Sequence, residues 1–297
     1  MSHRILNDLA PTAISTQSHP REGVDIQFSE SGLEVSEQWS MGGWLLQFIR
    51  LPANETLVLD ASAGRIFIKV IYGSLANITR GPFAKPREVR STRVASDHVM
   101  AGESDTLFAV FTETPSAPAN VHDMTKLTIV GPNADAFRWR SFQDRFGDFI
   151  SGFDGADAYM SGGFHLLDSN GIEITYVNLW TAGKGVNLTT HNHDNEPHPL
   201  GPTFAETHWV FNNGTGRGGM YGADSPGGAK TDVYPMQRGD EHGPFFFIDN
   251  ETRKPMLRKN GSVNYPWHGW EGGVDDKPGQ AYDVVAAFET NPQYAEI

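Results

Sequence analysis

The chain has 297 residues, which is enough for two lobes of about 150 residues each. Its 23 Lys and Arg against 36 Asp and Glu give a net charge of −13, and a field of this sign repels phosphate backbones and anionic lipid surfaces. We therefore expect neither nucleic acid nor a membrane among its partners. The absence of cysteine excludes disulfides, thiolate metal sites and cysteine nucleophiles.

Residues 1–20 are expected to form an N-terminal arm. The first 15 of them include Arg4 and Asp8 and lack the apolar core of a signal peptide. No later segment is apolar over the ~18 residues that a membrane-spanning helix needs. These observations predict a cytoplasmic protein.

Short segments with the composition of strands recur along the chain. Glycine (32 residues) and proline (18 residues) divide it at frequent intervals, and between them lie runs rich in Val, Ile, Phe and Thr. Regular short strands separated by turns are typical of sandwiches and barrels rather than of alternating strands and helices. The predicted strands are 44–50, 55–59, 65–71, 107–112, 173–179, 207–211, 244–248 and 282–288.

One segment near the middle, 134–146, has the composition of a helix and ends before Gly147. We therefore predict an all-β protein in which two barrels are joined by a linker with a short helix. The predicted first lobe covers 21–132, the linker 133–158 and the second lobe 159–297.

Histidines are concentrated in the second lobe, where four of the 11 in the chain lie between His191 and His208. On a strand, residues two apart share a face, so His191 and His193 present two neighbouring imidazoles. Glu206 and His208 have the same spacing after a loop. Imidazoles with a carboxylate suit a divalent metal such as Zn, Mn, Fe or Ni.

A further ligand is needed from another segment. The segment 238–244 precedes the next predicted strand and carries His242, so the predicted ligands are His191, His193, Glu206 and His242. Glu196 and His208 remain alternatives for the third ligand. His198 is expected to contact the loop or the substrate instead.

The spacing of these residues resembles that of the cupin superfamily. A Gly, a His-x-His pair, a Glu and a closing Gly form its first motif, matched here by Gly185, His191, His193, Glu206 and Gly214. Pro235, Gly239 and His242 are similar to its second motif. The segment from His193 to Glu206 is longer than in the usual pattern. The resemblance implies a bicupin, with two double-stranded β-helix (jelly-roll) barrels in tandem.

The first lobe shows a weak internal repeat of the second. Segments 57–62 and 65–73 align with 188–193 and 206–214, which puts Asp60, Ser62 and Arg65 where the second lobe has His191, His193 and Glu206. We therefore expect the first lobe to be a degenerate copy without metal ligands.

Three short motifs resemble the cupin portion of the aldos-2-ulose dehydratase family. They are His-Asn-His-Asp at 191–194, Ala-Glu-Thr-His-Trp at 205–209 and Asn-Gly-Thr-Gly-Arg-Gly-Gly-Met at 213–220, and the similarity extends over 172–247. The resemblance implies a metal-dependent dehydratase, which is a lyase, or an isomerase. Its substrate would be a small sugar-like hydroxy-carbonyl compound, converted through a metal-stabilised enediolate.

Such a reaction needs a base and an acid. His208 is the first candidate for the base and Glu241 the second, and His268 or a tyrosine is the candidate acid. His268 lies in the aromatic segment 265–271, which either packs in the core or stacks against a sugar ring.

Two other functions remain open. Three or four His and Glu ligands also suit an Fe(II)-dependent dioxygenase, and aromatic loops suit a non-catalytic carbohydrate-binding bicupin. The residue pattern selects neither the metal nor one of the two expected oligomeric states, monomer and homodimer.

Overall fold

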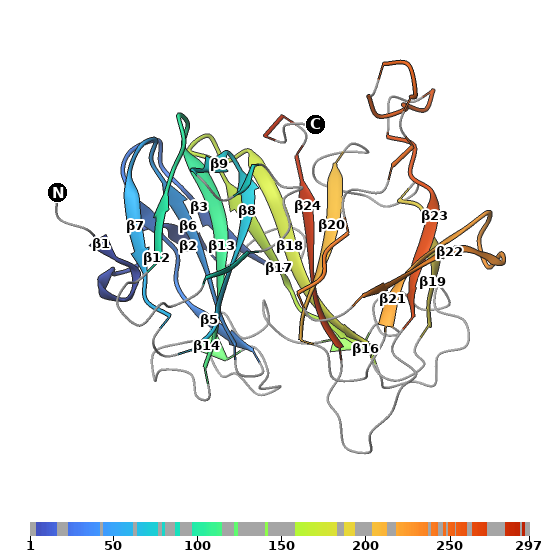
Figure 1. Ribbon diagram of the computed structural model, residues 1–297, viewed down its shortest axis with the longest axis horizontal. Helices are drawn as coiled ribbons and strands as arrows, with labels where there is room; N and C mark the ends of the chain where they lie inside the picture. The colour runs from blue at the N-terminus through green and yellow to red at the C-terminus, as the bar shows by residue number, and fades with distance from the viewer. Residues whose placement is uncertain are drawn as a thin grey trace. The chain divides into compact units, whose positions relative to one another are not determined.

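The computed structural model consists of strands, with one short 3₁₀ helix, η1 (Leu6–Asp8), among the residues that it describes (Figure 1). This confirms the predicted all-β class. The described residues are 4–16, 23–41, 44–61, 64–76, 79–80, 87–89, 97–114, 122–123, 140–141, 158–182, 187–193, 204–212, 218–236, 239–242, 246–247, 249–252, 254–259, 263–271, 283–291 and 293–294.

The chain divides into two compact units, and neither unit is one continuous segment. The first contains Met1–Arg138, Gly162–Tyr176 and Gln293–Glu296. The second contains Trp139–Ser161, Val177–Pro292 and Ile297. The predicted second lobe, 159–297, thus includes two segments that belong to the first unit.

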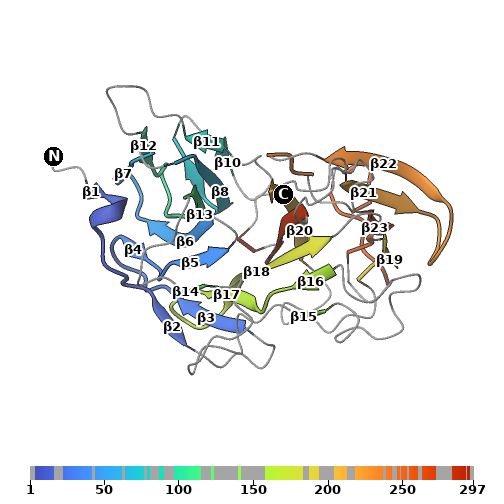
Figure 2. The same ribbon diagram turned by 90° about the horizontal axis from the view of Figure 1, so that it is seen from below.

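The first unit has three layers of strands, which Figure 2 shows from below. Its central sheet has seven strands in the order β11-β8-β13-β6-β5-β14, with β4 paired to β6. The sheet β1-β7-β12 lies on one side, and β2, β3 and β17 lie on the other. A separate pair joins β9 to β10. These strands are β1 (Arg4–Ile5), β2 (Ile14–Thr16), β3 (Gly23–Gln27), β4 (Glu34–Val35), β5 (Trp39–Met41), β6 (Trp44–Leu51), β7 (Thr56–Leu59), β8 (Ile66–Tyr72), β9 (Ser74–Leu75), β10 (Thr79–Arg80), β11 (Arg87–Val89), β12 (Asp97–Met100), β13 (Thr106–Glu113), β14 (His122–Asp123) and β17 (Gly163–Leu167).

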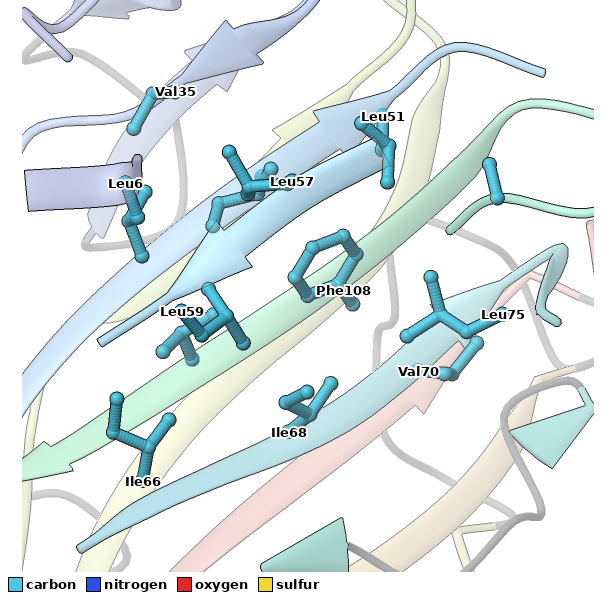
Figure 3. Packing of buried hydrophobic residues seen from close by; sticks show 13 residues of the cluster. Leu6, Val35, Leu51, Leu57, Leu59, Ile66, Ile68, Val70, Leu75 and Phe108 are labelled. Atoms are coloured by element: carbon cyan, nitrogen blue, oxygen red, sulfur yellow. The ribbon is translucent and has the colours of Figure 1, made fainter. Parts of the chain in front are cut away.

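An aliphatic core fills the space between the central sheet and the sheet β1-β7-β12. Alternation along β8 turns Ile66, Ile68 and Val70 toward this space. Phe108 of β13 and Leu57 of β7 pack against them (Figure 3). None of the five is more than 3% exposed, so hydrophobic burial holds these two layers together.

An aromatic group packs on the other side of the central sheet. The ring of Phe164 on β17 lies 4.9 Å from that of Trp39 and 5.4 Å from that of Phe48. On the opposite face of β17, Gly163 makes room for Tyr176 of β18, because an added Cβ at Gly163 would lie 1.9 Å from that ring.

The second unit is a sandwich of two sheets. One has the order β15-β16-β18-β24-β20 and the other the order β19-β23-β21-β22. β18 begins in the first unit and belongs to the second from Val177 onward. The strands are β15 (Arg140–Ser141), β16 (Ala158–Met160), β18 (Glu173–Ala182), β19 (Asn187–His191), β20 (Ala205–Asn212), β21 (Gly218–Ala223), β22 (Lys230–Met236), β23 (Trp267–Glu271) and β24 (Asp283–Thr290).

The inner faces of these two sheets form the second core. Trp180, Val210 and Val285 come from one sheet, and Met220 and Trp270 come from the other. Side chains two apart on a strand share a face. The residues two positions before Val210 on β20 and Trp270 on β23 are polar. Alternation along the strands therefore turns their side chains into the space between the sheets.

Most of the predicted strands are confirmed. Strands β6, β7, β8, β13, β18, β20 and β24 cover the predicted segments to within a few residues. The segment 244–248 is different, because the described residues Phe246 and Phe247 are not in a strand. They lie in a loop, where the Phe247 N–H donates to the carbonyl of Asn264.

The helical linker and the closed barrels are not confirmed. Within 134–146 the structure describes Arg140 and Ser141, which form β15 by pairing with Met160 and Tyr159. Helix propensity is a weak preference that such pairing overrides. The described strands form sheets with open edges, and a sandwich buries its core without a closed ring of hydrogen bonds.

In the part of the chain that the structure describes, no helix is long and apolar enough to cross a membrane.

Candidate metal centre

Strand β19 delivers the first two histidines, although not in the way the sequence predicts. β19 ends at His191, and His193 lies beyond it with a φ of 57°, in the left-handed region that residues other than Gly rarely adopt. The two rings nevertheless lie close, with centroids 4.7 Å apart. The turn of the chain, rather than alternation on a strand, brings these imidazoles together.

Strand β23 adds a third histidine to this pair. It pairs antiparallel with β19, and the register places His268 opposite His191. The Nε2 atom of His268 lies 3.2 Å from Nε2 of His193. One ring nitrogen from each of His191, His193 and His268 lies within 4.8 Å of the others. Among the described residues this three-histidine cluster is the group that can hold a metal ion.

Strand β20 brings a carboxylate to the cluster. Glu206 and His208 share a face of β20, and Glu206 is 3% exposed. Its Oε2 lies 2.6 Å from His193 Nε2, and its Oε1 lies 3.1 Å from His208 Nε2. Burial raises the pKa of Glu206, but the neighbouring His193 and His208 outweigh it and bring this pKa well below its ordinary value. The side chain is therefore a carboxylate, as metal coordination requires.

The protonation of His268 fits a ligand. Its Nδ1 lies 2.9 Å from the carbonyl oxygen of Pro266, which can only accept, so Nδ1 carries the proton and Nε2 presents a lone pair. Burial lowers the pKa of His268 well below its ordinary value, and His191 and His193 lower it further. A neutral imidazole whose second nitrogen is held by a carbonyl is the usual form of a metal-bound histidine.

A second acidic side chain lies on the same face of this sheet. Glu206 Oε2 is buried, and Glu289 on β24, 8% exposed, stands directly opposite Glu206 in the register of β20 and β24. Two neighbouring carboxylates favour a cation beside them. Three imidazoles and a carboxylate suit Zn, Mn, Fe and Ni alike.

The structure separates His242 from the three-histidine cluster. Its Nε2 lies 2.7 Å from Nδ1 of His208, and its backbone N–H donates to the His208 carbonyl at 3.4 Å. Glu241 pairs with Trp209 in an isolated β-bridge. Strand geometry therefore places both residues on the face of β20 opposite to Glu206 and His208. Glu196 and His198 lie outside the described residues.

The aromatic segment 265–271 packs in the interior. Tyr265 and Trp270 are 3% and 2% exposed. The ring of Tyr265 lies 5.3 Å from that of His193 and 5.5 Å from that of Phe204. Burial raises the pKa of Tyr265, with Glu206 and Glu289 adding to the effect, so the phenol stays protonated. The rings of Tyr265 and Phe204 lie against His193 as a buried wall rather than as an open platform for a sugar.

Sequence reasoning missed His268 as a companion of His191 and His193 and missed Glu289 altogether. His268 is 75 residues from His193, and only the pairing of β19 with β23 joins them. The feature of the sequence that could have indicated His268 is a histidine within a strand rich in aromatic residues.

Comparisons with solved structures return proteins of low identity. A cupin 2 conserved barrel domain protein from Leptotrichia buccalis is 10% identical, with 88% of this chain and 90% of that chain covered and a TM-score of 0.27. Oxalate decarboxylase from Bacillus subtilis is 14% identical, with 84% of this chain and 68% of that chain covered and a TM-score of 0.26. Superpositions at these TM-scores do not assign a fold.

Sequence comparisons are more specific. The aldos-2-ulose dehydratase of Phanerodontia chrysosporium is 30% identical in an alignment of 239 residues that covers 71% of this chain and 25% of that protein. The chain thus spans about a quarter of the length of the curated relative it matches. The family model described as the aldos-2-ulose dehydratase/isomerase (AUDH) cupin domain matches residues 27–291, well over half of the chain. The chain therefore belongs to the family of aldos-2-ulose dehydratase/isomerase cupin domains.

Proposed function

We propose that this protein is a metal-dependent lyase or isomerase that acts on a small, sugar-like hydroxy-carbonyl compound. The observation that carries the proposal is the buried cluster of His191, His193 and His268 beside the carboxylate of Glu206. Membership of the family supports the substrate class, because the relative's name describes dehydration of an aldos-2-ulose.

The proposed metal ligands are His191, His193, Glu206 and His268. His268 takes the place that the sequence analysis gave to His242, because His268 lies in the cluster and His242 does not. A divalent metal bound there would act as a Lewis acid toward a substrate carbonyl. Three of the four side chains, those of His191, Glu206 and His268, come from β19, β20 and β23, and rigid strands hold ligands more accurately than loops do. His193 follows β19 in a turn.

The acid–base roles predicted from the sequence change with this assignment. His268 is no longer free to serve as the acid, because its Nδ1–H donates to Pro266 and its Nε2 faces His193. His208 has Glu206 at one nitrogen and His242 at the other, so we assign it to holding Glu206.

Both lyase and isomerase chemistry begin with removal of a proton next to the carbonyl. In dehydration a hydroxyl then leaves as water, and in isomerisation a proton returns to the neighbouring carbon.

The first test is the metal content of protein purified without chelator. The wild type is compared with the double variant H191A/H193A and with a control, H98A, on β12 of the first unit. We expect near-stoichiometric divalent metal in the wild type and the control, and its loss in the double variant. Wild-type protein that takes up no metal even on reconstitution would overturn the proposal.

The second test measures turnover of an aldos-2-ulose by the metal-loaded protein in D₂O. The expected product is one water lighter, or an isomer that has gained deuterium at carbon, and H191A/H193A forms neither. Oxygen uptake that depends on ferrous iron, without loss of water, would identify a dioxygenase instead. Sugar binding without any turnover would identify a non-catalytic carbohydrate-binding protein.

A further inference from the structure

We infer that His242 is a positioning residue that acts through His208 to hold the Glu206 carboxylate toward the metal site. The inference rests on the proposed function, because it assigns Glu206 to the metal. It concerns a histidine that does not belong to the three-histidine cluster.

A continuous line of short contacts supports it. His242 Nε2 lies 2.7 Å from His208 Nδ1, and His208 Nε2 lies 3.1 Å from Glu206 Oε1. The other oxygen of the same carboxylate, Oε2, lies 2.6 Å from His193 Nε2. One oxygen of Glu206 is therefore held by His208, and the other faces the cluster.

The donor and acceptor types explain how this line holds Glu206. A carboxylate oxygen can only accept, so the Nε2–H of His208 donates to Glu206. The contact of His208 Nδ1 with His242 Nε2 fixes the plane of the His208 ring. His242 thereby keeps the Nε2–H of His208 directed at Glu206.

The backbone around His242 is fixed to β20, which gives the contact a defined geometry. Gly239 has a φ of 90°, and its N–H donates to the Val210 carbonyl at 2.7 Å. The N–H of Val210 donates in turn to the carbonyl of Asp240 at 3.0 Å. His208 is constrained as well, because the ring of Trp180 meets it edge-on at 5.7 Å.

Residues that orient a metal ligand through hydrogen bonds tune the metal site without contacting the ion. Loss of such a partner weakens metal binding by about 10- to 100-fold. A ligand behaves differently, because its removal opens the coordination sphere whatever polar group replaces it. This difference separates a positioning role for His242 from the ligand role predicted from the sequence.

The experiment compares H242A with H242Q, whose side-chain amide can still form a hydrogen bond with His208 Nδ1. Zinc affinity is measured by competition with a chromophoric chelator, with H98Q as control. We expect binding about 10- to 100-fold weaker in H242A, near wild-type binding in H242Q, and turnover by H242A that recovers at saturating metal. Equal loss in both variants would make His242 a ligand, and no change in either would remove its role; both outcomes overturn the inference.

A second measurement needs neither metal nor activity. Long-range ¹H–¹⁵N spectra of the metal-free protein report the ring protons of His208, and near-UV circular dichroism checks that the variants are folded. The wild type and H242Q are expected to show a His208 Nε2–H that is protected from exchange with solvent, and H242A is expected to lose that protection. An unprotected Nε2–H in the wild type would overturn the inference even if the proposed function holds. If the protein shows the expected protection but binds no metal, the proposed function alone is overturned.

Discussion

At the scale of single residues, the backbone of His193 is the unusual feature of the site. Its φ of 57° places it in the left-handed region, which costs a residue with a Cβ roughly 1–2 kcal/mol. Strained backbone of this kind persists where the surrounding structure fixes it, often at functional sites. Here the strain turns the His193 ring toward Glu206 and His268, 2.6 Å and 3.2 Å away.

This strain predicts different effects of glycine and alanine at position 193. In metal-free protein H193G is expected to be about 0.5–1 kcal/mol more stable than H193A. Gly adopts a positive φ without a clash, and this gain is larger than the extra chain entropy that Gly loses on folding. Urea unfolding of both variants measures the difference. The same pair at His191, on β19, is the control and should show the opposite order. H193A as stable as H193G would mean that no strain is present.

The residue types at the site were predictable from sequence, but their partners only in part. The spacing of His191, His193 and Glu206 indicates a site for a divalent metal, and these side chains do lie near one another. The neighbour of His193 across the sheet, His268, depends on the register of two strands. Spacing along the chain carries no information about register, so the sequence pattern favours His242, which is nearer along the chain.

At the scale of elements, β17 depends on the small size of its first residue. A Cβ at Gly163 would lie 1.9 Å from the Tyr176 ring, far inside normal contact. G163A is expected to lower the free energy of unfolding by about 1–3 kcal/mol, as overpacking of a core does. The comparison is G222A on β21, where the nearest atom is Thr231 Oγ1 at 3.0 Å. Equal stability of the two variants in urea would contradict this view of β17.

A second element-scale prediction concerns the turn between β17 and β18. Partial burial raises the pKa of Asp168, but hydrogen bonds from the Tyr294 hydroxyl and from the N–H groups of Ile172 and Asn170 lower it below its ordinary value. A carboxyl group with a lowered folded-state pKa adds stability at pH values above its unfolded pKa, and this contribution disappears as the pH falls through the folded-state pKa.

We therefore expect Y294F to be less stable than the wild type at pH 7 by about 0.5–1 kcal/mol, because the turn is largely in solvent. The difference should shrink as the pH falls below about 4, near the unfolded pKa of Asp. Thermal unfolding across this pH range measures it, with Y234F on the exposed strand β22 as control. A difference that stays constant down to about pH 2, well below that unfolded pKa, would show that Asp168 is not involved.

The elements that sequence predicted best are those buried on both faces. β6, β8 and β13 consist mostly of apolar residues, and most of their residues are buried. β17 and β23 were not predicted, because each is short and mixes Gly and His with its apolar residues. Their assignment depends on partners that are distant in sequence, such as β3 for β17.

At the scale of the whole molecule, composition predicted the all-β class and not the path of the chain. Glycine, proline and β-branched residues act locally, and they mark strands wherever those strands finally pair. The lobes predicted from sequence were continuous segments, 21–132 and 159–297. The first unit instead also contains Gly162–Tyr176 and Gln293–Glu296, and Phe164 of the former segment packs against Trp39 and Phe48.

This interlaced path constrains how such a gene can change. The chain enters the second unit at Trp139, returns to the first at Gly162, re-enters the second at Val177 and comes back at Gln293. A recombination event with a single breakpoint in the middle of the gene would deliver one unit without β17 and the other with a strand it does not use. A gene fragment that encodes the whole of the first unit therefore has to include the coding sequence of the second as well.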